Sequence, residues 1–177
     1  MTQIVLGRTR IVVAALALVT LAGCTVGSNL TANGDFRAGT RDWVGVQAQI
    51  SPVMSSIGPA AQVRPYGGTT YAIAQDPLSL TLPRAQAGHI YVAEADVMTS
   101  APLSVTTVSV DGSLSGSCQS HGSPWSSPSG WVHISVVCSS FRDGETLDVS
   151  VGSKIIGTPG GGIMFDVTNI TLRELTP

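Results

Sequence analysis

The clearest structural signal in the chain lies in Trp131-Val132-His133-Ile134-Ser135-Val136-Val137-Cys138, where apolar and polar side chains largely alternate. Its apolar face carries Val132, Ile134, Val136 and Cys138. Successive side chains of a β-strand point to opposite faces of the sheet, so this period predicts a strand with one buried face.

Working outward from that stretch, other short segments share its alternation or its Val and Thr content. These predicted strands are residues 78–82, 89–99, 103–110, 146–151 and 163–175. Gly, Pro, Ser and Asp separate them, and no helical stripe of ten or more residues follows Cys24. Residues 113–130, rich in Ser, Gly and Pro, are predicted to form a long loop or hairpin. The pattern predicts an all-β sandwich.

Composition excludes several classes of protein. The chain has 177 residues, with 11% charged and 5% aromatic residues, and its 9 basic residues are outnumbered by 11 acidic ones. It is too apolar for a disordered chain. It also lacks the basic excess of a nucleic-acid-binding protein, so no nucleic-acid partner is expected.

The amino end has the pattern of an export signal. Arg8 and Arg10 precede an apolar run over residues 11–22, which is too short to span a bilayer. The run ends in Leu21-Ala22-Gly23-Cys24, which resembles the lipobox of bacterial lipoproteins. The resemblance implies cleavage before Cys24 and lipid on its thiol. The alternative is an ordinary secretory signal whose cleavage site happens to precede a cysteine.

These signals predict the organisation of the chain and its location. Residues 1–23 are a signal peptide, residues 24–28 are the lipidated Cys24 with a short tether, and residues 29–177 are one domain. The protein is expected at the cell membrane, lipid-anchored on the extracytoplasmic face. More than one acyl chain is needed for stable anchoring. Because the mature chain is acidic, we expect the domain to stand off from anionic lipid.

The remaining cysteines, Cys118 and Cys138, are predicted to form a disulfide in an exported protein. In the chain-entropy model, closing a loop of about 20 residues, such as the one between Cys118 and Cys138, stabilises a fold by about 3 kcal/mol. The alternative is a pair of buried thiols. Neither cysteine belongs to a Cys-x-x-Cys motif, and no histidine spacing suggests zinc.

Four landmarks in order along the chain resemble carbohydrate-binding modules of the family 4/9 type. They are Asn33-Gly34-Asp35-Phe36 followed by Gly39 and Trp43, Gly88-His89-Ile90-Tyr91, Gly130-Trp131, and residues 165–172. The resemblance implies a jelly-roll β-sandwich, galactose-binding-domain-like, that binds glycans without catalysis. It also implies that Trp43, Trp131 and Tyr91 fill the core.

The chain departs from that family where many members hold a structural calcium. Arg37 stands where the family commonly has Glu, and Thr168-Asn169 replaces an acidic pair. Calcium needs several oxygen ligands, usually with anionic charge, so these changes argue against the site. Asp35 and Asp166 could partly compensate. No metal ligand is therefore assigned, and calcium stays an open alternative.

Candidate ligand-binding residues lie in two loops. Trp125 sits in a Ser- and Pro-rich loop without apolar neighbours, which favours binding, although it could also be a lid on the sandwich. Tyr66 and Tyr71 flank a Gly-Gly turn, with Arg64 and Gln75 close by in sequence. These four could line a concave face, or form a solvated hairpin.

Catalytic patterns are missing from the sequence. The three histidines are scattered, and no Gly-x-Ser-x-Gly elbow occurs. We therefore expect no enzyme. The leading hypothesis is a membrane-anchored, glycan-binding envelope lipoprotein. The alternative is an envelope scaffold that uses the same sandwich to hold a protein partner.

Overall fold

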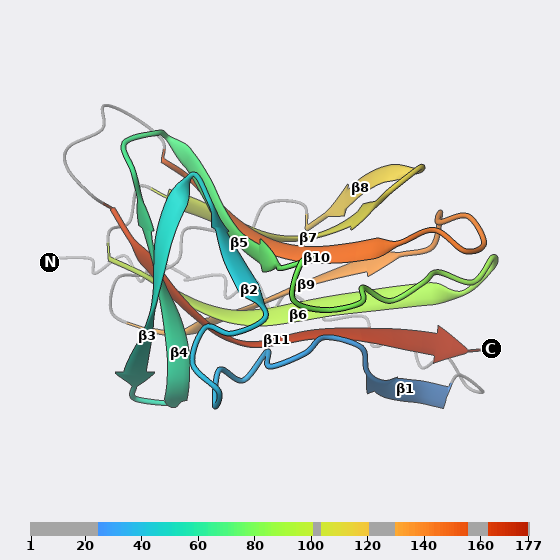
Figure 1. Ribbon diagram of the computed structural model, residues 1–177, viewed down its shortest axis with the longest axis horizontal. Helices are drawn as coiled ribbons and strands as arrows, with labels where there is room; N and C mark the ends of the chain where they lie inside the picture. Colours follow the sequence, from blue (N-terminus) through green and yellow to red (C-terminus); the bar gives the residue numbers. More distant parts are fainter. Residues whose placement is uncertain (1–24, 101–103, 121–129, 156–162, 177) are drawn as a thin grey trace, which may run out of the picture.

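The computed structural model describes residues 25–100, 104–120, 130–155 and 163–176, and in this part of the chain all regular structure is β (Figure 1). The strands are β1 (Thr25–Asn29), β2 (Trp43–Val46), β3 (Ala48–Ser55), β4 (Gly58–Pro65), β5 (Thr70–Gln75), β6 (Ile90–Thr99), β7 (Ser104–Gly112), β8 (Gly116–Gln119), β9 (Val132–Cys138), β10 (Leu147–Ile155) and β11 (Phe165–Thr176). Among these described residues, no helix is long and apolar enough to cross a membrane.

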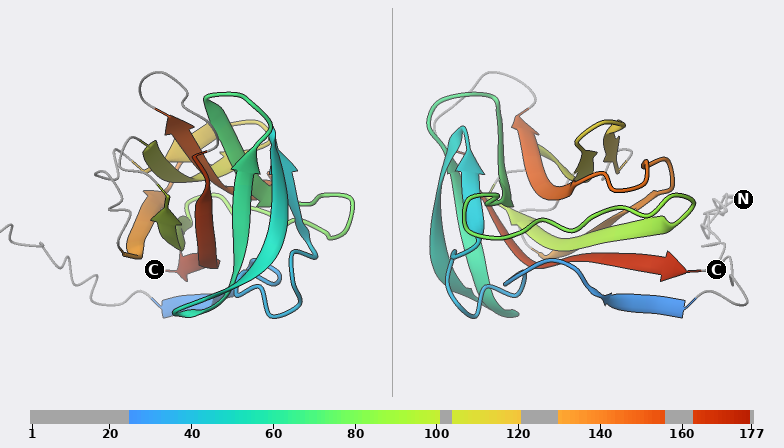
Figure 2. Two further views of the ribbon diagram at one scale, coloured as in Figure 1. Left: turned by 90° about the vertical axis from the view of Figure 1, so that its left-hand side faces the viewer. Right: turned by 45° about the vertical axis from the view of Figure 1, so that its right-hand side comes forward.

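The strands form two antiparallel sheets. Sheet A has the order β3-β4-β11-β6-β9, with β1 added on β11, and sheet B has the order β2-β5-β10-β7-β8. On β11, β4 pairs with the segment from Phe165 to Val167, whereas β1 pairs near Arg173 and Thr176. Figure 2 shows β1 alongside the C-terminal part of β11. This arrangement confirms the predicted all-β jelly-roll sandwich.

The core fills the space between the sheets with the inward side chains of both. In β10 the buried Val149 and Val151 alternate with partly exposed Ser150 and Gly152. In β9 the same alternation buries Ile134 and Val136. Each of these two strands therefore has one face that loses water on folding, which is the main favourable contribution to stability.

The predicted strands within residues 89–99, 103–110, 131–138, 146–151 and 163–175 correspond to β6, β7, β9, β10 and β11. The prediction for residues 78–82 is wrong. Asp76 starts a turn there, since its Oδ1 accepts a hydrogen bond from Leu78 N and its carbonyl accepts one from Ser79 N. Leu78 is 95% exposed, so the alternation of apolar and polar residues in this segment does not mark a buried strand face.

Part of the predicted loop over residues 113–130 is a strand. β8 pairs with β7, and the pairing joins Ser109 to Gln119 and Gly112 to Gly116. Residues 121–129 lie outside the described residues. The predicted disulfide is confirmed: Cys118 of β8 bonds to Cys138 of β9, with 6.0 Å between their Cα atoms. It joins an edge strand of sheet B to an edge strand of sheet A.

The short tether expected after Cys24 is instead part of the sheet. Residues 25–28 belong to β1, in which Thr25 pairs with Thr176 and Val26 pairs with Leu175. The Thr25 and Thr176 hydroxyls also hydrogen bond to each other. The backbone groups of β11 offer this segment a pairing partner, which a composition-based interpretation of a short polar stretch cannot reveal.

Candidate functional site

The outer face of sheet B carries a hollow lined by small and hydroxyl-bearing residues. Since Tyr71, Val108 and Val151 point into the core, the alternate residues of their strands point outward. We call this surface the sheet B trough and define it by Ala72, Ala74, Thr107, Ser109, Ser150 and Gly152. One hollow on this face has a volume of about 340 Å³ and is lined in part by Thr107, Ser109, Gln119 and Lys154.

The pairing register of β5, β10 and β7 places small side chains next to one another along the trough. Gly152 lies between Ala72 and Thr107, and Ser150 lies between Ala74 and Ser109. Small side chains at these crossings leave space above the sheet. Val44 and Val46 of β2, which are 41% and 47% exposed, form an apolar flank beside Ala74 and Ala72.

A polar chain runs along the trough toward the start of β10. Ser109 Oγ and Ser150 Oγ lie 2.8 Å apart, and Ser150 Oγ donates to Asp111 Oδ2 at 3.4 Å. Asp111 pairs across the strands with Asp148. Lys154 is exposed at the other end of β10. The trough therefore carries hydroxyls along its floor and opposite charges at its two ends.

The two carboxyl groups at this end titrate unusually. Burial, followed by the charge of Asp111, raises the pKa of Asp148 from 3.8 to about 6. Burial also raises the pKa of Asp111, which the hydrogen bond from Ser150 opposes. Asp148 Oδ1 is buried without a hydrogen-bond partner among the described residues. Perturbed carboxyl groups of this kind are more frequent at functional sites than elsewhere.

A second hollow adjoins the trough at the edge of the sandwich beside the disulfide. It has a volume of about 810 Å³, and its lining includes Cys118, Ser135, Val137 and Ser140. Thr107 and Gln119 line both this hollow and the hollow of about 340 Å³. Ligand-sized space thus continues from the face of sheet B to the β8 edge.

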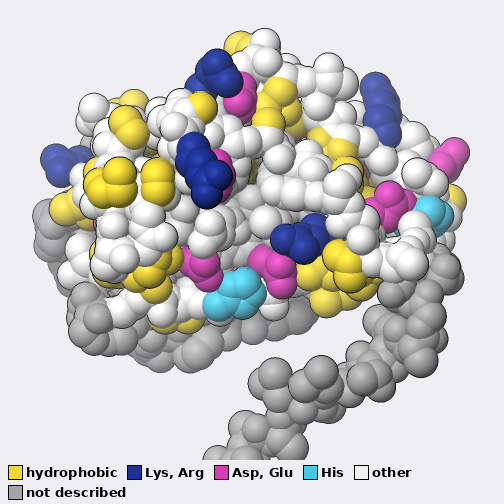
Figure 3. Space-filling view, turned by 90° about the horizontal axis from the view of Figure 1, so that it is seen from below, with side chains coloured by type: hydrophobic (Ala, Val, Ile, Leu, Met, Phe, Trp, Pro, Cys, Tyr) yellow, Lys and Arg dark blue, Asp and Glu magenta, His cyan; other side chains and the backbone are white. Residues whose placement is uncertain are grey.

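The outer face of sheet A differs, because His133 there is paired with two carboxylates. His133 Nδ1 lies 2.9 Å from Asp96 Oδ1, and His133 Nε2 lies 3.6 Å from Glu94 Oε1. Asn169 Nδ2 donates to Asp96 Oδ2 at 2.8 Å. Figure 3 shows acidic, basic and histidine side chains spread over this side of the molecule. In the described ranges, no group of three His, Cys, Asp or Glu residues is placed to hold a metal ion.

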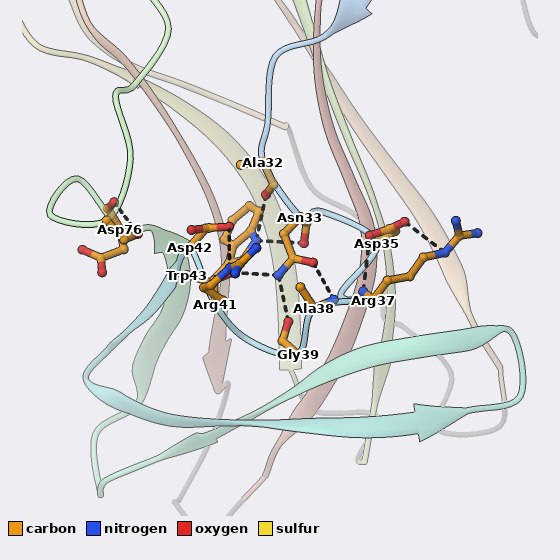
Figure 4. A network of polar contacts seen from close by, with 11 residues as sticks. Ala32, Asn33, Asp35, Arg37, Ala38, Gly39, Arg41, Asp42, Trp43 and Asp76 are labelled. Atoms are coloured by element: carbon orange, nitrogen blue, oxygen red, sulfur yellow. Dashed lines mark hydrogen bonds and ion pairs between the residues drawn. The ribbon is translucent and has the colours of Figure 1, made fainter.

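The loop that resembles a calcium site is closed by its own side chains (Figure 4). Asn33 Nδ2 donates to the carbonyl oxygens of Gly39 and Arg41, at 2.9 and 2.7 Å. A guanidinium nitrogen of Arg37 pairs with Asp35 Oδ2 at 3.2 Å. A hydrogen-bond donor therefore occupies the carbonyls that a cation would need, and the anionic group is neutralised. These residues do not fit calcium.

Asp166 does not compensate for this change. It accepts a hydrogen bond from Gln62 at 3.4 Å, and the two line a separate hollow with Met98 and Met164. Asp35 lines a different hollow, beside Asn169. Asp35 and Asp166 are thus engaged by different partners, Arg37 and Gln62.

The aromatic landmarks of the same loop pack as the family resemblance implies. Trp43 is 5% exposed, packs on Phe36 with ring centroids 5.7 Å apart, and donates from Nε1 to the carbonyl oxygens of Ala32 and Asn33. A Cβ atom on Gly34 would lie 1.9 Å from the carbonyl oxygen of Ile170, so the close approach of loop and β11 requires glycine there.

Two predicted binding residues are buried, which corrects the expectation that they line an exposed face. Tyr71 is 1% exposed, and its hydroxyl donates to the carbonyl oxygen of Ile163 at 2.6 Å. Gln75 is also 1% exposed, and its Oε1 accepts a hydrogen bond from Val149 N. Both stand at inward positions of β5, and sequence spacing near a turn did not reveal this.

Of the other predicted residues, the structure describes Arg64 and Tyr66. Arg64 is exposed near the end of β4, and Tyr66 follows that strand with 74% of its side chain exposed. Cys24 and Trp125 lie outside the described residues. Tyr91 is buried as expected, but Trp131 is only half-buried and donates from Nε1 to Ser56 Oγ at 3.3 Å.

Sequence reasoning missed the floor of the trough. It used the apolar residues of β10 to predict a strand and did not consider the opposite face. That face carries Asp148, Ser150, Gly152 and Lys154, which alternate with the apolar residues. The signal was therefore present in a single strand. The facing residues of β7 could not be found without knowing the register of the two strands.

No family model and no curated protein sequence matches this chain. Solved structures do match it. A cyclase from Fischerella sp. TAU matches with a TM-score of 0.66 and 10% identity, over 85% of this chain and 98% of the other. A family 61 carbohydrate-binding module in complex with beta-1,4-galactotriose matches with a TM-score of 0.58 and 9% identity, over 82% and 98%.

An arabinose-bound α-L-arabinofuranosidase matches with a TM-score of 0.65 and 13% identity, over 84% of this chain but only 27% of that enzyme. Carbohydrate-binding modules of families 16 and 4 share the fold as well. Identities this low show the fold alone. The chain has the jelly-roll fold of carbohydrate-binding modules, a fold that is also found in enzymes.

Proposed function

We propose that this protein is a non-catalytic glycan-binding module of the cell envelope, and that the sheet B trough is its binding surface. The observation that carries the proposal is the hollow of about 340 Å³ on the outer face of sheet B, whose lining includes the hydroxyl groups of Thr107 and Ser109. Several structures with the same fold are carbohydrate-binding modules.

The chemistry of the trough suits a sugar. Thr107, Ser109 and Ser150 supply hydroxyls that can donate and accept, as hydroxyl-rich ligands require. Val44 and Val46 offer apolar contacts for the C–H faces of a pyranose. The strands of sheet B place no aromatic side chain on this outer face, so binding rests on hydrogen bonds and small apolar contacts. We therefore expect weak affinity for a short glycan.

Filling the trough provides the test. A Cβ atom on Gly152 would meet its nearest neighbours at 3.6 Å, an ordinary contact distance, so the backbone accepts a side chain there and Gly152→Val adds bulk to the trough. We expect this variant to weaken glycan binding about tenfold, which corresponds to roughly 1.4 kcal/mol. The measurement is a glycan array and a polysaccharide pull-down with residues 25–177.

The matched control is Ser51→Val, which adds similar bulk on β3 of sheet A, at a position that lines neither of the two hollows. It should leave affinity unchanged. Equal affinity for Gly152→Val and the parent would remove the trough from the proposal. Trp125→Ala tests the remaining sequence prediction in the same assay, and repeating the assay with calcium and with chelator tests the metal.

The proposal includes anchoring of the module to the membrane by lipid on Cys24. Its support is the lipobox-like Leu21-Ala22-Gly23-Cys24 after a short apolar run. Mass spectrometry of the protein from a lipoprotein-processing host should find an acylated amino-terminal cysteine. Substitution of Cys24 by Ser should release the protein from the membrane fraction.

A second candidate function is favoured by the shortage of aromatic side chains on the trough. An envelope scaffold that holds a protein partner needs no sugar platform, and the apolar flank at Val44 and Val46 suits a protein surface. A pull-down from envelope extract, with and without competing glycan, separates the two. Capture that glycan does not displace, together with no binding on the array, would favour the scaffold.

A further inference from the structure

The position of β1 determines how the module can sit on a membrane. Thr25 directly follows Cys24 in the sequence and already pairs with Thr176 at the end of β11. Consecutive Cα atoms are about 3.8 Å apart, so a lipid on Cys24 leaves the domain almost no free chain. The end of the sandwich that carries Thr25 and Thr176 must therefore lie close to the anchor.

Three loops gather at this same end, which we call the β1 end and define by residues 84–89, 113–115 and 141–146 together with Thr25 and Val26. Tyr91 pairs with Glu174 across the strands, and its ring meets that of Phe141 edge to face, with centroids 6.0 Å apart. Ala87 N donates to Asp143 Oδ1, and Leu114 N donates to Glu145 Oε1. Figure 1 shows the C-terminus of β11, β1 and the β7–β8 turn at one side of the molecule.

The exposed groups of the β1 end suit lipid headgroups. Leu114 and Val26 are 66% and 61% exposed. Arg84 and Arg142 are also exposed, and neither forms an ion pair with any described residue. Arg84 donates from Nη1 to the carbonyl oxygen of Gly144 at 2.8 Å, and the neighbouring Asp143 is exposed as well. Apolar side chains beside arginines that lack a carboxylate partner can enter the interface while the guanidinium groups contact phosphates.

We propose that the β1 end rests against the lipid headgroups and that the strands stand upright from the bilayer, an orientation that rests on the proposed lipid on Cys24. The domain then approaches the membrane through an end that exposes Arg84, Arg142 and Leu114, without a free tether between them. β10 rises from Leu147 to Ile155, nine residues at about 3.3 Å each. The trough thus extends away from the membrane, with Lys154 at its outer end.

Tryptophan reporters at the two ends test the orientation in the full-length protein. Leu114→Trp marks the β1 end, and Tyr66→Trp marks the opposite end, where Thr69 hydrogen bonds to Ile155. Each processed variant is placed in vesicles of brominated phosphatidylcholine with a minority of phosphatidylglycerol. We expect the bromines to quench the added fluorescence of Leu114→Trp at least about twofold more than that of Tyr66→Trp, relative to the parent.

A linker variant supplies the matched control. Inserting about ten Gly and Ser residues between Cys24 and Thr25 gives a free reach of about 17 Å while the lipid is kept. Quenching of Leu114→Trp should then fall toward the Tyr66→Trp value. Equal quenching of both reporters in lipidated, vesicle-bound protein would overturn the orientation and leave the anchor intact. A mass spectrum without lipid on Cys24 would refute the anchor, and the orientation with it.

Discussion

Glu145 and Asp148 lie three residues apart in the sequence, yet the fold treats their carboxyl groups in opposite ways. Glu145 is 1% exposed and accepts hydrogen bonds from Leu114 N, Ser115 N, Ser115 Oγ and Arg142 N. Burial would raise its pKa, but these hydrogen bonds outweigh burial and lower the pKa from 4.5 to about 2.

Asp148 has a weaker set of donors, because backbone hydrogen bonds from Gln75 and Val149 lower its pKa but do not outweigh burial. One of its oxygens is buried without a partner in the described part of the chain, and Asp111 stands opposite it on β7. Its pKa is raised to about 6 by burial and by the charge of Asp111. The difference teaches that Glu145 builds the β7–β8 turn, whereas Asp148 costs stability in its ionised form. A costly carboxyl at the end of the trough is what a binding function would retain.

The largest effect is expected from removing the negative charge of Glu145, whose carboxylate accepts the backbone hydrogen bonds of the β7–β8 turn. Glu145→Gln places an amide nitrogen among donors that need an acceptor, so buried donors lose partners. We expect the largest fall in the midpoint of thermal unfolding among the variants discussed here, by several degrees. Circular dichroism melting at pH 7 measures it, and an unchanged midpoint would contradict the role of Glu145.

The pH dependence of that effect follows from the direction of the shift. Because the pKa of Glu145 is lowered on folding, its ionised form stabilises the fold fully above about pH 4.5. The contribution is lost as the pH falls from about 4.5 to about 2. The gap between parent and Glu145→Gln should therefore narrow over this window and be constant above it.

Removing the charge of Asp148 should have the opposite sign and a smaller size. Since its pKa is raised on folding, stability is highest below about pH 3.8 and declines as the pH rises toward about 6. Asp148→Asn lacks this decline and should melt about 2–4 °C higher at pH 7, the shift that roughly 1 kcal/mol gives in a chain of this length. This free energy is set below what the full pKa shift of Asp148 would give, because solvent screens the charge of a partly exposed group.

The same melting series checks the sign for Asp148. The gap between Asp148→Asn and the parent should grow between about pH 3.8 and pH 6 and stay level above that range. A variant that melts below the parent at pH 7 would show that the ionised carboxylate stabilises the fold. Asp111 and Asp148 would then not repel each other as their register implies.

Much of the fold could be predicted from single strands, because burial of one face leaves a period of two in the sequence. Ile134 and Val136 of β9 and Val149 and Val151 of β10 show it plainly. The disulfide between Cys118 and Cys138 could be predicted from the number of cysteines and the export signal, and it is confirmed. Leu78 shows the limit of the method, since the turn at Asp76 exposes a segment that alternates as well as a strand.

The candidate site was less predictable, because it is a property of register. Asp111 and Asp148 are far apart in sequence, and only the pairing of β7 with β10 places them opposite each other. Strand geometry also decides the positions of Tyr71 and Gln75, which the sequence placed in a binding face but which point into the core. One residue of register decides whether a side chain of β5 points to the trough, as Ala72 and Ala74 do, or into the core.

The finest test of the comparison is Ser150→Ala, which removes the hydroxyl that donates to Asp111 at 3.4 Å. That hydrogen bond opposes the effect of burial on the pKa of Asp111, so its loss should raise this pKa further. A more protonated Asp111 repels Asp148 less, and the pKa of Asp148 should fall in turn. Carboxyl NMR titration of both residues measures the two shifts, with Ser135→Ala on the opposite sheet as control. Shifts in the same direction would show that the carboxyls respond to solvent access and not to each other, whereas opposite shifts would establish the trough end as one coupled pair.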